Sequence, residues 1–104
     1  MQIVVNTDAH IRGTEALSKD TEARIMNHIS RFESRLTRIE VHLSDENSAA
    51  KGGPAMRCLL EARMANHQPV VASHQAETVE LAIDGAAQKL DHALTSVVGR
   101  LSDR

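Results

Sequence analysis

The chain has almost no aromatic residues: among its 104 residues there is one Phe, Phe32, and no Trp or Tyr. Proteins that stack the bases of single-stranded RNA need several exposed rings, so the composition excludes a base-stacking platform. A single cysteine, Cys58, cannot form a disulfide within the chain, which fits a reducing cytoplasm. No apolar run reaches the roughly 20 residues that span a bilayer, so we expect neither a membrane-spanning segment nor a secretory signal.

An excess of basic charge is also missing. Twelve basic and fourteen acidic side chains give a formal net charge of −2. A protein that coats nucleic acid by bulk electrostatics would be clearly basic, so any contact with RNA must come from a local patch.

Motifs for catalysis are absent as well. The sequence has no glycine-rich phosphate loop, no nucleophile elbow and no paired cysteines, so we expect neither an enzyme nor a cofactor. None of its six histidines has a strong ligand spacing, and we expect solvated surface histidines rather than a metal site. Cys58 falls in the inward register of a predicted strand, which indicates a buried, inert thiol.

Hydrophobic periodicity predicts four strands and two helices. Alternating or β-branched segments predict the strands, at Gln2–Thr7, Arg38–Asp45, Met56–Ala65 and Val70–Ser73. Apolar residues at three- and four-residue steps predict one helix from an N-cap at Thr14 to about Leu36. They predict a second, longer helix that begins between Gln75 and Thr78 and runs to about Ser102.

The order β-α-β-β-β-α predicts an α+β fold in one domain, residues 1–104. Each helix has a single apolar stripe, so both should pack on one face of a four-stranded mixed sheet. A right-handed crossover would make the first two strands parallel. The segment Asn47–Pro54 has the composition of a loop. The other face of the sheet should be open to solvent.

A stripe of basic side chains flanks the apolar face of the first helix. At about 100° per residue, its members fall within roughly 60° of one another: they are Arg24, His28, Arg31 and Arg35. Three more arginines follow near the helix or on the predicted open sheet face, namely Arg38, Arg57 and Arg63. The planar guanidinium fork suits phosphate oxygens, so the stripe is a candidate RNA contact.

The same pattern has a purely structural explanation. Charged side chains normally flank the apolar stripe of an amphipathic helix, and arginine stems cover the edges of cores. Arg38 alternates with Glu40, and Arg57 and Arg63 with Glu61, so cross-strand ion pairs would occupy these arginines.

Over essentially its whole length the sequence resembles the ribosome hibernation-promoting factor family. That family includes the ribosome-associated translation inhibitor, and its members are often labelled sigma factor modulation proteins. The resemblance lies in Met1-Gln2-Ile3, Thr14-x-Ala16-Leu17, Arg38-Ile39-Glu40-Val41-His42-Leu43-Ser44 and Ala82-Ile83-Asp84-x-Ala86-x-x-Lys89-Leu90. No one of these motifs is highly specific, but their order and spacing agree.

The resemblance implies a cytoplasmic, non-enzymatic protein that binds the small ribosomal subunit. Family members occupy the channel of messenger RNA and transfer RNA and block translation through basic contacts with ribosomal RNA phosphates. Arg24 matches a family Lys or Arg, and Lys89 matches the family lysine of the last helix. With the arginines of our own argument, the predicted RNA-binding residues are Arg24, Arg31, Arg35, Arg38, Arg57, Arg63 and Lys89.

The sequence also departs from the family pattern. Acidic residues outnumber Lys89 and Arg100 in the last helix, Glu80 replaces a frequent aromatic residue, and His28 takes an apolar position. Because the chain ends after that helix, we expect a short family form. These departures leave an alternative function open, a protein-interaction module of the same fold that has lost RNA binding, with a homodimer as one form it could take; the sequence leaves the oligomeric state open.

Overall fold

The computed structural model describes residues 1–46 and 56–102, so the predicted loop Asn47–Pro54 lies outside the described residues. The elements follow the predicted order, with a short 3₁₀ helix after the first α-helix. They are β1 (Gln2–Thr7), α1 (Glu15–Ile29), η1 (Ser30–Arg35), β2 (Arg38–Asp45), β3 (Met56–Arg63), β4 (Val70–Ala76) and α2 (Val79–Ser102).

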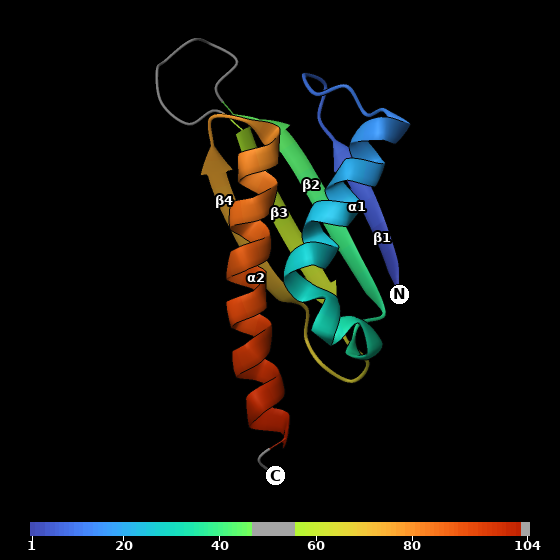
Figure 1. Cartoon of the computed structure of the whole chain (residues 1–104), viewed down its shortest axis with the longest axis vertical. Helices are drawn as coiled ribbons and strands as arrows, with labels where there is room; N and C mark the ends of the chain where they lie inside the picture. Colours follow the sequence, from blue (N-terminus) through green and yellow to red (C-terminus); the bar gives the residue numbers. More distant parts are fainter. Residues whose placement is uncertain (47–55, 103–104) are drawn as a thin grey trace.

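The strands form one mixed sheet in the order β1-β2-β3-β4. β1 runs parallel to β2, while β2, β3 and β4 are successively antiparallel. Both helices pack side by side on the same face of this sheet (Figure 1). The predicted α+β architecture and its parallel first pair are therefore confirmed. Neither described helix is long and apolar enough to cross a membrane.

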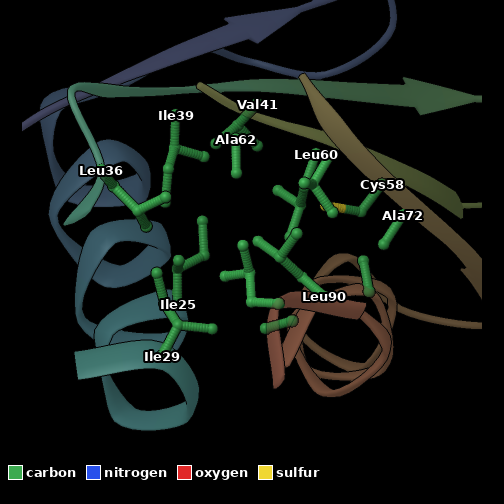
Figure 2. Close-up of a cluster of buried hydrophobic side chains, with 14 of the residues drawn as sticks. Ile25, Ile29, Leu36, Ile39, Val41, Cys58, Leu60, Ala62, Ala72 and Leu90 are labelled. Atoms are coloured by element: carbon green, nitrogen blue, oxygen red, sulfur yellow. The ribbon is translucent and has the colours of Figure 1, made fainter. Parts of the chain in front are cut away.

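The core lies between the sheet and the two helices. Alternate residues of β2 and β3 are buried, as the period of two predicted, and they meet the apolar stripes of α1 and α2 (Figure 2). The largest fully buried side chains include Ile25, Ile29, Ile39, Leu60 and Leu90. No helix of residues 1–46 and 56–102 covers the remaining face of the sheet, which contains the charged residues of β2 and β3.

The first helix begins as predicted but ends early. The Thr14 hydroxyl accepts a hydrogen bond from the Leu17 amide at 3.1 Å, which makes Thr14 the N-cap. The α-helix ends at Ile29, and a 3₁₀ turn continues to Arg35. A period of three residues keeps Phe32 on the same side as Ile29, and both are buried. The apolar stripe is therefore continuous although the helix type changes.

Two strand ends also differ from the prediction, and the first is that of β3, which stops at Arg63 and not at Ala65. β4 continues to Ala76 because the ladder with β3 extends to the pair Met56–Ala76. Leu101, an apolar residue near the C-terminal end of α2, is 43% exposed. The reason is visible in Figure 1, where the C-terminal part of α2 extends past the end of the sheet.

Candidate nucleic-acid interface

Three members of the basic stripe, Arg24, His28 and Arg31, meet acidic side chains of α2. Arg24 donates from Nη1 to Asp84 Oδ2 and from Nε to Asp20 Oδ2, both at 2.8 Å. The hydrogen bond with Asp20, followed by the charges of Asp20 and Asp84, raises the pKa of Arg24. His28 lies on the other oxygen of Asp84, with Nε2 3.6 Å from Oδ1. The guanidinium of Arg24 is therefore already paired.

Arg31, seven residues after Arg24, is paired with α2 in a similar way. Its Nη2 donates to Asp91 Oδ1 at 2.8 Å and to Thr95 Oγ1 at 2.6 Å. Its guanidinium carbon also lies 4.7 Å from the centre of the Phe32 ring. The Arg31 side chain is still 60% exposed, so it is paired on one side and open on the other.

The two interhelical ion pairs follow one rule. Arg24 and Asp84 are 60 residues apart, and so are Arg31 and Asp91. A constant offset means that α1 and α2 run side by side in the same direction, with matching seven-residue spacings. We missed these acidic partners in the sequence, although a spacing of seven within α2 is a signal that places Asp84 and Asp91 on one face.

On the open sheet face, like charges lie opposite each other. The register pairs Arg38 with Arg63 and Glu40 with Glu61, so the cross-strand ion pairs that we considered do not form between directly opposite residues. Arg38 instead bonds Glu40 on its own strand, with Nη2 3.1 Å from Oε1. Arg63 is exposed and has no acidic partner among residues 1–46 and 56–102.

Four of the predicted arginines lie on segments that adjoin at one end of the sheet, where Arg38 is directly opposite Arg63 in the register. Arg31 and Arg35 belong to η1, Arg38 begins β2, and Arg63 ends β3. The Thr37 amide donates to the Arg63 carbonyl at 2.8 Å and fixes this corner. We call the four arginines the basic end.

Arg35 is the most available member of the basic end on the helical side. Its side chain is exposed, and it has no acidic partner in the described part of the chain. It lines a shallow hollow of about 310 Å³ between η1 and α2, together with Arg31, Phe32, Thr95, Val98 and Gly99.

The other three predicted residues lie away from the basic end. Arg57 is near the opposite end of β3, where it lies opposite Ser44 of β2 and Gln75 of β4 in the strand register. Lys89 lies on the β4 side of α2 and donates from Nζ to the Ser73 carbonyl at 3.2 Å. Arg24 is enclosed by its two carboxylates. The seven predicted residues therefore do not form one patch.

Comparison with known proteins gives a family match over almost the whole chain. The family model described as "Sigma 54 modulation protein / S30EA ribosomal protein" matches residues 4–102. No curated protein matches the sequence significantly.

Solved structures of the same fold are found at low sequence identity. A ribosomal subunit interface protein from Coxiella burnetii matches with a TM-score of 0.76 and 13% identity, over 95% of this chain and 99% of that one. The N-terminal domain of Thermus thermophilus Protein Y matches with a TM-score of 0.62 and 16% identity, over 88% and 89% of the two chains. Identities this low support the shared fold alone.

Proposed function

The chain belongs to the sigma 54 modulation protein / S30EA ribosomal protein family, and we propose that it binds the small ribosomal subunit and restrains translation. It does so in the cytoplasm by occupying the decoding channel under stress, and it catalyses no reaction. The family match over residues 4–102, whose description names a ribosomal protein, supports this assignment.

The basic end is the observation that carries the RNA-binding part of the proposal. Arg35 and Arg63 have no acidic partner among the described residues, and Arg31 and Arg38 are only partly occupied. All four project from regular structure, so phosphate contacts would cost little ordering of the backbone. Arg24, Arg57 and Lys89 then make outlying contacts of lesser weight.

Ribosome co-sedimentation across a salt series tests the proposal, with Arg63→Glu as the main variant. About four phosphate contacts predict a log–log slope of affinity against salt of about −4, and loss of one contact should reduce that slope by about 1. Arg57→Glu is the matched control, because Arg57 lies on the same strand and the same face at the other end. We expect Arg63→Glu to weaken pelleting with the small subunit and Arg57→Glu to weaken it much less.

Two results would contradict the assignment. Equal losses in the two variants would mean that bulk charge, not the basic end, governs binding. Unchanged pelleting of the double variant Arg35→Glu/Arg63→Glu would remove the basic end from the interface. Thermal unfolding of each variant checks that the fold is intact.

The ion pairs of Arg24 with Asp84 and of Arg31 with Asp91 favour one alternative, a protein-interaction module of this fold that no longer binds RNA. In that case the protein would not pellet with ribosomes even at the lowest salt concentration. A homodimer would appear as a mass that doubles with concentration in size-exclusion chromatography with light scattering.

A further inference from the structure

The open face of the sheet brings together three side chains of the types that ligate metals. Glu40 and His42 come from β2 and Glu61 from β3, and one ligand atom of each lies within 4.8 Å of the other two. Glu40 is directly opposite Glu61 in the register. His42 is diagonal to Glu61, with Nε2 3.2 Å from Oε1. The cluster depends on cross-strand pairing, so no spacing along the sequence revealed it.

The negative charge of this cluster favours the binding of a cation. Two carboxylates directly opposite each other in a sheet repel and lower stability. Arg38 offsets the charge of Glu40 through its contact with Oε1, whereas Glu61 has only His42 as a partner among the described residues. A dication between the carboxylates would turn the repulsion into attraction.

We propose that Glu40, His42 and Glu61 bind a first-row divalent cation of the Zn²⁺ type. One imidazole nitrogen and two carboxylate oxygens are a donor set that suits zinc, with water at the remaining position. Bonds of about 2.0–2.2 Å put the ligand atoms of a tetrahedral site about 3.4 Å apart. The 3.2 Å between His42 Nε2 and Glu61 Oε1 already fits this spacing, and a side-chain rotation of Glu40 would bring its oxygen to the same distance from the other two ligand atoms.

The surroundings of the cluster resemble those of metal sites. Arg38 binds Oε1 of Glu40, which leaves Oε2 for the ion and orients the carboxylate as an outer-shell partner does. In the register, Leu59 lies opposite His42 and Val71 opposite Glu61. Glu40 and Glu61 are 23% and 29% exposed, so the ligands are partly shielded and still open to an ion from solvent.

Calorimetric titration of the chelator-treated full chain with ZnCl₂ tests the site. We expect one Zn²⁺ ion per chain, and binding weakened at least about tenfold in His42→Ala, since even the loss of an outer-shell partner weakens metal binding by roughly 10- to 100-fold. His67→Ala is the control, because His67 is an exposed histidine in the turn between β3 and β4. No binding by the unaltered chain, or equal weakening in both variants, would overturn the proposal.

Glu61→Gln separates loss of the ligand from loss of the fold. Glutamine keeps the side-chain size and removes one of the two opposing charges, so the variant should fold. We expect Zn²⁺ to raise the Tm of the unaltered chain and to leave the Tm of Glu61→Gln unchanged. An equal rise in both proteins would place the ion elsewhere. Neither readout involves ribosomes, so the test is independent of the proposed function.

Discussion

Cys58 lies in β3 with its side chain in the core, as the strand register predicted. Burial raises the pKa of its thiol to about 12, and the charge of Arg57 opposes this effect only in part. A thiolate in the core would lose its hydration, so the thiol stays protonated at neutral pH.

We therefore expect Cys58 to resist alkylation in the folded protein. At pH 8 a maleimide reagent should label the native chain very slowly and the chain in guanidinium chloride completely. Mass spectrometry of timed samples measures both rates. Fast labelling of the native protein would mean that β3 opens readily or that the thiol is exposed.

Asp8 connects the end of β1 with the end of β2. The Asp45 amide donates to its Oδ2 at 2.9 Å, and the His10 and Ile11 amides donate to its Oδ1. The hydrogen bond from Asp45, and then those from His10 and Ile11, lowers the pKa of Asp8 below 3.8. Because the pKa is lower in the folded state, this stabilisation is complete above the ordinary pKa and is lost as the pH falls through the folded pKa.

The Asp8→Asn variant tests this linkage. We expect it to be less stable than the unaltered chain at pH 7 and nearly as stable at the acidic end of a pH series. Urea unfolding at several pH values measures the difference. Glu22→Gln, which alters an exposed carboxylate without a partner in the described residues, should show no such trend. A stability difference independent of pH would contradict the ionic role of Asp8.

At the level of elements, the sequence predicted β2, β3 and the start of α1 because local signals determine them. Strict alternation fixes the face of each strand, and Thr14 has the side chain that an N-cap requires. The end of α1 and the second half of β4 depend on partners instead. His74 and Gln75 are polar, and they join the sheet only because Cys58 and Arg57 lie opposite.

His74 also explains a glycine in α2. A Cβ at Gly85 would lie 2.0 Å from His74 Cδ2 and 2.5 Å from Cγ, whereas a Cβ at Gly99 would have nothing within 4 Å. Gly85→Ala should therefore displace the ring and destabilise the protein by about 1–3 kcal/mol. Gly99→Ala should stabilise it by about 0.5–1 kcal/mol, because alanine loses less backbone entropy in a helix.

Thermal or urea unfolding of the two alanine variants measures these opposite effects. Adding His74→Ala to Gly85→Ala should recover part of the lost stability, because the clash disappears with the ring. If Gly85→Ala were as stable as Gly99→Ala, the result would contradict the close packing of the His74 ring against Gly85.

At the level of the whole molecule, the sequence located the arginines but not their environment. The helical period placed Arg24 and Arg31 on one face of the predicted first helix, and the structure confirms that they share a side, although Arg31 lies in η1. Their pairing with Asp84 and Asp91 depends on two helices packing in parallel, which no local pattern reveals. The basic end likewise forms only because η1, β2 and β3 meet at one corner.

Substitution of the two aspartates should free the charges of Arg24 and Arg31, which these ion pairs now neutralise. In Asp84→Asn/Asp91→Asn the net charge rises from −2 to 0, and Arg24 and Arg31 lose their interhelical carboxylate partners. If these arginines contact ribosomal RNA, affinity for the small subunit should rise, and the salt dependence should become steeper by up to about 2 in log–log slope. Stability should fall little, since partly exposed ion pairs contribute about 0–1 kcal/mol each.

A matched control separates freed arginines from a change in overall charge. Glu77→Gln/Glu80→Gln alters the net charge equally near the start of α2, and neither carboxylate pairs with an arginine in the described chain. Co-sedimentation with ribosomes at increasing salt compares the two double variants. An increase in affinity confined to Asp84→Asn/Asp91→Asn would mean that Asp84 and Asp91 weaken phosphate binding by Arg24 and Arg31. An equal gain in both would reduce the effect to net charge, and no gain in either would restrict the contact to Arg35, Arg38 and Arg63.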